Sequence, residues 1–175
     1  MQIEELDADG LVRDIDGLAA LMHACVHHGD NIGFILPFSL DDARAFWRDR
    51  IAPGLASGTR RLLAARESER VAGTVHLSFD TMPNQRHRSD VSKLMVHPEA
   101  RRNGIGRRLM VELERIAREE RRTLLTLDTR ERGGAEPFYH SLGYQVVGVI
   151  PRYARAPHSD RLVGTVVMFK ELIAN

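Results

Sequence analysis

The sequence predicts a mixed α/β sheet with helices on its faces, in one domain that spans residues 1–175. A length of 175 residues is typical of a single domain and suffices to bury a full hydrophobic core. Apolar segments recur along the whole chain, with no low-complexity tract, linker or internal repeat between them. These segments alternate between strand and helix spacing, which is the order that builds a sheet covered by helices.

Two helices are expected ahead of the first strand. Residues 12–28 carry apolar side chains at helical spacing. Ser39 is a candidate N-cap for a second helix, which is expected to stop at Pro53 and Gly54. The apolar residues 31–38 between the two helices have no repeating pattern and are expected to form a loop.

Six strands are expected from alternating or short apolar runs: residues 61–66, 71–79, 90–97, 123–127, 144–150 and 163–170. Two further helices are expected, one at residues 104–121 and one at 135–141. The strand–helix–strand order over residues 90–127 is typical of a right-handed crossover, so its two strands are expected to be parallel.

The composition excludes several classes of protein. A net charge of +1 argues against a general nucleic-acid coat. The single cysteine, Cys25, excludes an internal disulfide and a cysteine-rich metal module, and its apolar surroundings predict a buried, inert thiol. The N-terminus is acidic, unlike a signal peptide, and no apolar run is long enough to span a membrane. A cytoplasmic location is expected.

Residues 97–107 are the most informative segment, because there a strand passes into a helix through two closely spaced glycines. A helix N-terminus has unpaired backbone N–H groups and a partial positive charge, and Gly104 and Gly106 let an anion approach closely. Three arginines add fork-shaped donors: Arg101, Arg102 and Arg107. The turn therefore predicts a phosphate site, and an ordinary turn with surface arginines is the alternative. No Walker A string is present, and Leu109 stands where a Rossmann fingerprint needs a third glycine.

The string Arg101-x-x-Gly104-x-Gly106 matches the Arg/Gln-x-x-Gly-x-Gly/Ala signature of the GNAT N-acetyltransferases, in which this loop binds the pyrophosphate of acetyl-coenzyme A. The string opens an amphipathic helix, and residues 138–144 resemble the second motif of that family. Three further strings resemble the tabtoxin-resistance-like branch of small-molecule acetyltransferases: residues 128–130, 136–139 and 150–154.

The resemblance implies the GNAT fold, with about seven strands, helices on both faces of the sheet and two N-terminal helices. It implies direct attack of an amine on the acetyl thioester of acetyl-CoA, without an acyl-enzyme. It also implies a set of cofactor-binding residues: Leu94, Met95, Val96, Arg101, Arg102, Asn103, Gly104, Ile105, Gly106, Arg107 and Phe138. Among these, the backbone of residues 94–96 holds and polarises the thioester carbonyl.

Two catalytic residues are expected. Tyr139 matches the general acid of the family, and its ordinary pKa near 10 keeps it protonated at neutral pH. Asp128 is the favoured general base, because ligands of open α/β sheets lie beyond the carboxyl ends of the strands. Asp90, His76 and His97 are alternative bases. Structural roles also stay open: a core tyrosine, an aspartate that caps a turn, a solvent-facing His76 and a His97 that closes its strand.

The expected acceptor is a primary amine of a small molecule, such as an amino acid derivative, an antibiotic or a toxin. In the family, the N-terminal helices and the loop between the last two strands wall the acceptor site. The apolar candidates for acceptor binding are Phe34, Phe38 and Tyr153, with Trp47 in the same regions and Asp30, Asp41 and Asp42 nearby. Residues 1–50 hold ten acidic and four basic side chains, which suggests the hypothesis of a cationic acceptor.

The alternatives are a protein or peptide N-acetyltransferase and a non-catalytic acyl-CoA sensor. No metal is expected, because His23 and His27 have helical i, i+4 spacing without a further ligand. Neither a nucleic acid nor a membrane is expected as a partner, since the arginines of residues 107–122 are mixed with glutamates that can pair with them. A homodimer with a second copy of the chain is a further candidate.

Overall fold

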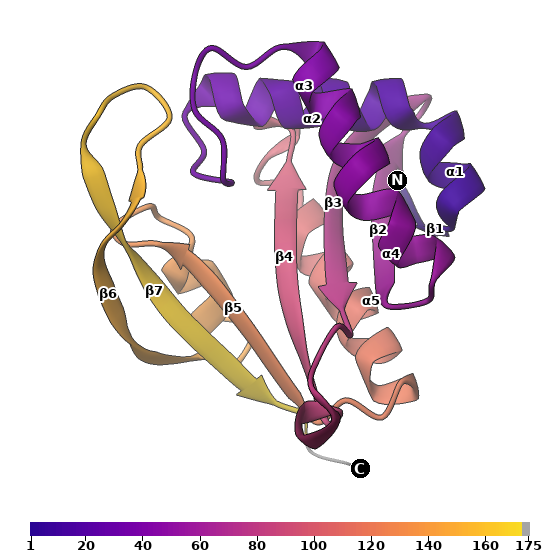
Figure 1. Ribbon diagram of the computed structural model, residues 1–175, viewed down its shortest axis with the longest axis vertical. Coiled ribbons are helices and arrows are strands. Elements are labelled where there is room, and N and C mark those ends of the chain that lie inside the picture. The colour runs from indigo at the N-terminus through magenta and orange to yellow at the C-terminus, as the bar shows by residue number, and fades with distance from the viewer. Residues whose placement is uncertain (173–175) are drawn as a thin grey trace.

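The computed structural model describes residues 1–172 and contains one seven-stranded mixed sheet in the order β1-β2-β3-β4-β5-β7-β6 (Figure 1). The strands are β1 Gln2–Leu6, β2 Arg60–Glu67, β3 Arg70–Ser78, β4 Arg88–Val96, β5 Leu124–Arg130, β6 Gln145–Arg155 and β7 Leu162–Glu171. The α-helices are α1 Ala8–Arg13, α2 Ile15–His28, α3 Leu40–Phe46, α4 Ala52–Ala56, α5 Ile105–Glu119 and α6 Glu136–His140. The predicted α/β fold is confirmed.

Strand pairing divides the sheet into two halves. Strands β1 to β4 are antiparallel to one another, and so are β5, β7 and β6. The halves meet where β4 pairs with β5 in parallel, as the crossover through α5 predicts. We call β1–β4 the N-terminal half and β5–β7 the C-terminal half.

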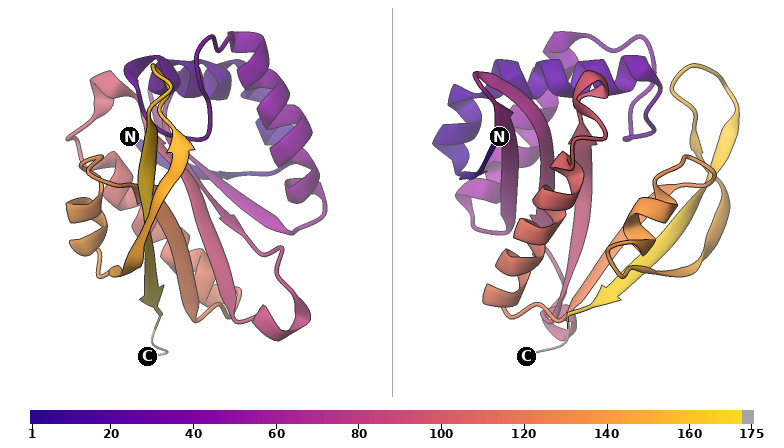
Figure 2. Two further views of the ribbon diagram at one scale, coloured as in Figure 1. Left: turned by 60° about the vertical axis from the view of Figure 1, so that its left-hand side comes forward. Right: turned by 180° about the vertical axis from the view of Figure 1, so that it is seen from behind.

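Helices cover both faces of the N-terminal half, as Figure 2 shows. On one face α5 packs its apolar stripe, which includes Leu109 and Leu113, against Leu63 and Val75 of the sheet. On the other face α2, α3 and α4 enclose a second core, in which Trp47 is fully buried. No helix within residues 1–172 is long and apolar enough to cross a membrane.

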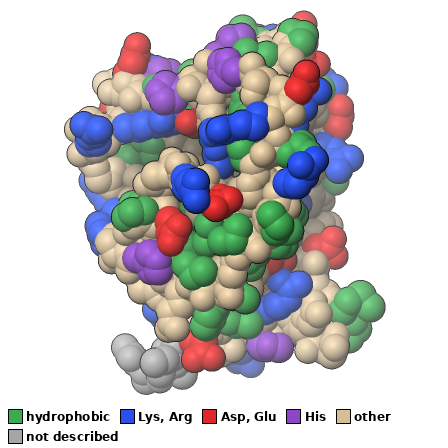
Figure 3. Space-filling view, turned by 90° about the vertical axis from the view of Figure 1, so that its left-hand side faces the viewer, with side chains coloured by type: hydrophobic (Ala, Val, Ile, Leu, Met, Phe, Trp, Pro, Cys, Tyr) green, Lys and Arg blue, Asp and Glu red, His purple; other side chains and the backbone are tan. Residues whose placement is uncertain are grey.

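Helices cover the C-terminal half of the sheet less than the N-terminal half. The short helix α6 contributes Tyr139 to the same core as α5, whereas the edge strand β6 is exposed at nearly every position. Figure 3 views the molecule from this side and shows apolar side chains among the charged ones. Five of the exposed apolar side chains belong to β6: Val146, Val147, Val149, Ile150 and Tyr153.

The N-terminal helices differ from their predicted bounds. The predicted helix at residues 12–28 is two helices, α1 and α2, because Asp7 caps α1 and Asp14 leaves helical geometry between them. The second predicted helix does not stop at Pro53, because a π-helical turn, Trp47–Ile51, continues it into α4. Proline is tolerated in the first turn of α4, where no intrahelical hydrogen bond needs its missing N–H. The capping role of Ser39 is confirmed by its bonds with Asp42.

Three features of the strands were not predicted. Strand β1 has an acidic sequence without clear alternation and forms because it pairs with β2, for example Leu6 with Leu62. Strand β5 continues to Arg130, so Asp128 lies within the strand rather than at its end. The expectation of a solvent-facing His76 is wrong: this side chain is 4% exposed, because helices cover its face of the sheet too.

Candidate active site

The two halves of the sheet separate where β4 and β5 stop pairing. Only residues 88–90 of β4 pair with residues 124–126 of β5, and the strands then diverge (Figure 1). A bulge in β4 accompanies the split, with Lys93 in the left-handed region at a φ of 52°. Residues 94–96 therefore have β3 as their strand neighbour on one side and, within residues 1–172, no strand on the other. Their free edge faces the gap between the halves.

The turn after β4 is anchored from within by Arg101. Its Nε donates to the carbonyl oxygen of Val96 at 3.1 Å, and its guanidinium forms an ion pair with Asp30 beyond the end of α2. Arg101, expected to hold phosphate, is therefore bonded to the chain itself. Asn103 and Arg102 follow it as exposed residues.

The N-terminus of α5 is open to an anion. Gly104 precedes the helix with a φ of 76°, and no side chain caps the first turn. A Cβ placed on Gly104 would meet nothing within 4 Å, so the approach to the free N–H groups of Ile105 and Gly106 is not filled by the protein. The geometry, the helix charge and the neighbouring arginines fit a pyrophosphate group.

Helix α6 docks beside this turn. A Cβ on Gly106 would lie 3.4 Å from the ring of Phe138, so this glycine gives Phe138 its place against α5. Arg107 donates to the Ser141 hydroxyl at 2.6 Å, just after α6. The second motif of the sequence is thus brought against the first, although more than 30 residues separate them.

Tyr139, the predicted general acid, is 7% exposed, and its ring lies edge-on to Phe138 and Tyr144. Its hydroxyl makes no hydrogen bond within residues 1–172. Burial raises the pKa of Tyr139 above its ordinary value, and the negative charge of Asp128 raises it further. The hydroxyl therefore keeps its proton across the physiological pH range and can donate it.

Asp128, the predicted base, is exposed and accepts a hydrogen bond from the Thr165 hydroxyl at 2.7 Å. Its charge adds to the effect of burial, which raises the pKa of Tyr139 on α6. It opposes the effect of burial on Lys93 of β4, whose pKa is lowered. Groups from both halves of the sheet therefore lie within electrostatic range of Asp128 at the split.

A family model for the GNAT acetyltransferase domain matches residues 37–155. The chain belongs to the GNAT acetyltransferase family. Solved structures agree with this fold. A ribosomal-protein-alanine N-acetyltransferase from Brucella melitensis is 23% identical with a TM-score of 0.75, and the match covers 98% of this chain and 100% of that one.

Two further solved structures have a ligand. YncA from Salmonella typhimurium, solved with its cofactor acetyl-CoA, has a TM-score of 0.75 at 20% identity, over 100% of this chain and 95% of that one. An aminoglycoside 6′-N-acetyltransferase complexed with coenzyme A has a TM-score of 0.73 at 19% identity, over 100% and 99% of the two chains. At these identities, the likeness establishes the fold.

In this GNAT domain, two loops close over one end of the split. The backbone N–H of Leu36, in the loop between α2 and α3, donates to the carbonyl of Pro157 in the β6–β7 loop at 3.0 Å. A Cβ on Gly29 would lie 3.3 Å from the His158 ring, so the loops also meet there. Figure 1 shows the β6–β7 loop beside this N-terminal loop. These loop contacts join the two halves of the sheet at the end where the acceptor is expected.

The structure brings together two of the three aromatic residues expected to bind the acceptor. The ring centroids of Phe34 and Phe38 are 4.6 Å apart, and the ring centroid of Phe46, which was not among the predicted residues, lies 5.1 Å from that of Phe34. Tyr153 lies apart on β6 and is 57% exposed. Phe46 shares a helix with Trp47, and its helical spacing alone indicated only a core position.

The acidic residues near the expected acceptor site are engaged elsewhere. Asp30 pairs with Arg101, Asp41 pairs with Arg44 at 2.7 Å, and Asp42 caps α3 through Ser39. Arg101 and Arg44 therefore offset two of the negative charges on which the hypothesis of a cationic acceptor rested. Hydrogen bonds from Ser39 lower the pKa of Asp42, so this carboxylate keeps its charge.

The alternative bases are placed less favourably than Asp128. Asp90 pairs with Arg88 at 2.7 Å, where β4 and β5 are still joined. His97 contacts Arg70, and burial followed by the Arg70 charge lowers its pKa. Burial, then the charges of Arg60 and Lys93, lower the pKa of His76 to about 3, so it is a weak base at neutral pH.

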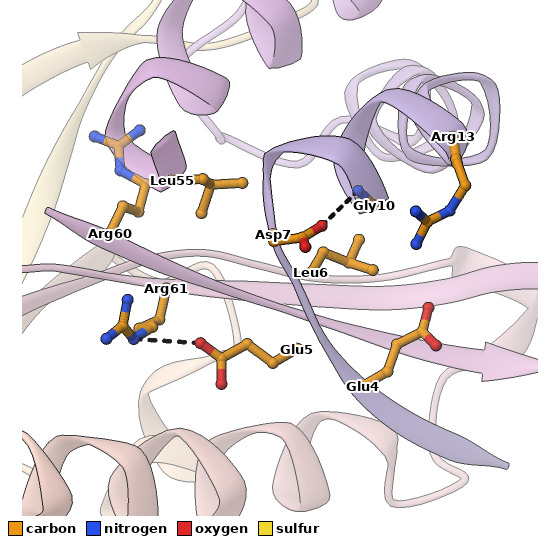
Figure 4. A pocket seen from close by; sticks show the side chains of 9 residues that line it. All are labelled: Glu4, Glu5, Leu6, Asp7, Gly10, Arg13, Leu55, Arg60 and Arg61. Atoms are coloured by element: carbon orange, nitrogen blue, oxygen red, sulfur yellow. Dashed lines mark hydrogen bonds and ion pairs between the residues drawn. The ribbon is translucent and has the colours of Figure 1, made fainter. Parts of the chain in front are cut away.

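The predicted burial of Cys25 is confirmed, and this burial raises the pKa of its thiol to about 12, so the thiol stays protonated at neutral pH. Within residues 1–172, no group of three or more His, Cys, Asp or Glu side chains could hold a metal ion. Figure 4 shows a hollow of about 370 Å³ lined by residues of β1, α1, α4 and β2. Its charged lining includes the Glu5–Arg61 ion pair at 3.3 Å, and it contains none of the predicted site residues.

Proposed function

We propose that this protein transfers the acetyl group of acetyl-CoA directly to a primary amine of a small molecule, such as an amino acid derivative, an antibiotic or a toxin. One observation carries the proposal: the uncapped N-terminus of α5, the free edge of β4 and the Tyr139–Asp128 pair lie around the same split in the sheet. The aminoglycoside acetyltransferase of the same fold, solved with coenzyme A, supports both the cosubstrate and a small-molecule acceptor.

Acetyl-CoA supplies a thioester whose carbonyl carbon accepts the amine. The first turn of α5, with Gly104, would hold its pyrophosphate through backbone N–H groups, and Arg102 and Arg107 would add positive charge. The free backbone edge of residues 94–96 would hold the carbonyl oxygen, where negative charge develops during attack. Phe138 would line the adjoining wall. Arg101 would act indirectly, by fixing the turn to Asp30.

Tyr139 would donate its proton to the departing sulfur, since its raised pKa keeps the hydroxyl protonated until the thiolate forms and the hydroxyl has no hydrogen bond to give up. Asp128 would take the proton of the attacking amine, directly or through a water molecule. The new N–C bond and the broken C–S bond are then balanced by one proton gained at sulfur and one lost from nitrogen.

A small acceptor is favoured over a protein because the Leu36–Pro157 contact closes the acceptor side. A peptide would need an open groove at that place. The ribosomal-protein-alanine N-acetyltransferase of the same fold supports the alternative, a protein N-acetyltransferase. Membership of the tabtoxin-resistance-like branch stays a prediction from the sequence.

The test is thiol release from acetyl-CoA with a panel of small amines and peptides. The wild type is compared with Tyr139→Phe and with the control Tyr144→Phe, which removes a buried hydroxyl from the neighbouring ring. We expect Tyr139→Phe to lose about a hundredfold or more in kcat and the control to keep wild-type kcat. Release with peptides alone would favour the protein acetyltransferase. Tight acetyl-CoA binding without any release would favour the sensor, and full activity of Tyr139→Phe would refute its acid role.

We also propose that any second copy of the chain associates along β6. An exposed edge strand offers unpaired backbone groups, and Val147, Val149 and Ile150 add apolar surface. Sedimentation equilibrium of the wild type and of Val147→Lys tests this, since a dimer formed there would dissociate in the variant. Nucleic acid is not expected as a partner, because arginines of α5 pair with glutamates, as Arg115 does with Glu112.

A further inference from the structure

Lys93 is a cation on the proposed acceptor side that has no carboxylate partner among the described residues 1–172. Its Nζ lies 5.9 Å from the ring centroid of Phe34 and 5.5 Å from that of Phe46. No carboxylate within residues 1–172 comes within 4.0 Å of this nitrogen. The side chain is half-buried, and aromatic faces alone replace only part of the hydration that an ammonium group loses.

The bulge of β4 gives Lys93 this position. A regular strand would alternate its side chains, whereas the bulge at Lys93, with its φ of 52°, re-aims the residue next to Ser92. The loop between α2 and α3 comes close to the same atom: a Cβ on Gly33 would be 3.7 Å from Nζ. A glycine at this point leaves the nitrogen less shielded than any other residue would.

The charges around Lys93 leave the site positive on one side and negative on the other. Burial lowers the pKa of Lys93, the charge of Asp128 opposes that effect, and Arg60 adds to it. Buried His76 lies on the same side, within range of both cations. Asp30, beyond the end of α2, is already paired with Arg101. Asp128, across the split, is therefore the negative group that faces this cluster.

We propose that Lys93 binds a carboxylate of the acceptor, so that the substrate is an amino-acid-like zwitterion with its amine toward Asp128 and its apolar side chain against Phe34 and Phe46. The inference rests on the proposed acetyl transfer and deepens it. A bound carboxylate supplies the charge partner that Lys93 lacks, and a charge-assisted hydrogen bond fixes the orientation of the acceptor. Such an acceptor differs from a polycation, which Lys93 would repel.

The experiment compares apolar L-amino acids with their carboxamides, which keep the amine and the side chain but lose the negative charge. Thiol release from acetyl-CoA is measured for the wild type, Lys93→Met and Lys93→Arg. We expect Lys93→Met to lose about 10- to 100-fold in kcat/KM for the amino acid, mainly through KM, with less than about threefold loss for the amide. Lys93→Arg keeps the charge and should retain the preference for the free acid.

Two results would overturn the role of Lys93 while leaving acetyl transfer intact. One is a wild type that uses amides as well as it uses free acids. The other is an equal loss of both substrates in Lys93→Met, which would mean that Lys93 only holds the aromatic loop in place.

If no amine gives thiol release, the proposed acetyl transfer fails. The carboxylate site at Lys93 is then tested separately, by calorimetric titration of the coenzyme A-saturated protein with the same amino acids and carboxamides. Binding of the acid that is lost in Lys93→Met supports the carboxylate site. Binding that is absent, or that does not depend on Lys93, refutes it.

Discussion

The two halves of the sheet each hold one of the two lysines of the chain, and they treat the charge in opposite ways. In the C-terminal half, Nζ of Lys170 lies 2.8 and 2.6 Å from the two carboxylate oxygens of Glu114, a residue that is 6% exposed. In the N-terminal half, Lys93 lies near aromatic rings and has no carboxylate partner within residues 1–172. Buried charges are normally paired, so the difference separates a structural lysine from one available to a ligand.

The helices follow the same division. Glu114, within α5, pairs with Lys170 of β7 and so links the two halves of the sheet where they are still joined. The N-terminus of α5, at the split, has no side-chain cap. The lysine of the C-terminal half is thus paired with a carboxylate of α5. The N-terminal half leaves two places suited to anions, one made by backbone groups at Gly104 and one by the side chain of Lys93.

The largest effect of a substitution is expected on acetyl-CoA binding, at the backbone N–H groups beside Gly104. Gly104→Val should weaken acetyl-CoA binding at least about a hundredfold, because a branched side chain would occupy the open approach to the helix N-terminus. Fluorescence or calorimetric titration measures the Kd. Gly58→Val is the matched control, since Gly58 has a φ of 72° and equally open surroundings in a turn away from the site. Equal Kd values for the two variants would show that only backbone strain had been measured.

The next effect concerns the two lysines directly. Lys170→Met should lower the free energy of unfolding by about 2 kcal/mol, because Glu114 would keep a buried charge with only Arg118, at 3.8 Å, to compensate. Lys93→Met should leave the stability unchanged or raise it, since it removes a cation without a carboxylate partner. Urea denaturation measures both. Equal losses of stability would erase the distinction between the two lysines.

A smaller effect is expected when pH changes the free energy of unfolding through His76. His76 has a folded-state pKa of about 3, below its ordinary value, so between these values the unfolded chain takes up a proton that the folded protein excludes. Stability from this group is present above the ordinary pKa and falls as pH drops toward 3, by at most about 1.4 kcal/mol per pH unit. His76→Gln should flatten this part of the stability profile between pH 6 and 4. A profile with the wild-type slope would contradict the buried, neutral histidine.

The smallest effect is expected at Tyr144, beside Lys170 in the C-terminal half. Its buried hydroxyl has no hydrogen-bond partner within residues 1–172, unlike the paired charges around it. Tyr144→Phe should therefore raise the free energy of unfolding by about 1 kcal/mol. Thermal unfolding measures the gain, and a loss of stability would reveal a partner for the hydroxyl, such as an ordered water molecule.

Much of the fold could be predicted from the sequence, because its signals are local. The apolar stripe of α5 and the cap at Ser39 follow from spacing within a few residues. The parallel pairing of β4 with β5 follows from the order of consecutive elements along the chain. The errors arose where distant segments decide. Strand β1 forms only against β2, and the polar face that contains His76 is covered by helices more than 20 residues away in the sequence.

The candidate site divides in the same manner. The roles of Tyr139, Asp128 and the cofactor-binding residues stay predictions, although their elements meet at the split. Lys93 was not predicted, because a lysine in an alternating strand carries no signal of a bulge or of the rings that surround it. The charge near the expected acceptor site also needs the tertiary structure, since the formal charge of residues 1–50 does not reveal which acids are already paired, as Asp30 is.

By itself, the sequence determined the turn at residues 97–107, because its glycines, its arginines and the following helix are neighbours along the chain. Only the tertiary structure decided which charges are neutralised, how β4 and β5 part, and that Leu36 meets Pro157 over the split. The physical reason is that a charge or a closed wall depends on partners far away in the sequence. A helix N-terminus needs only the residues beside it.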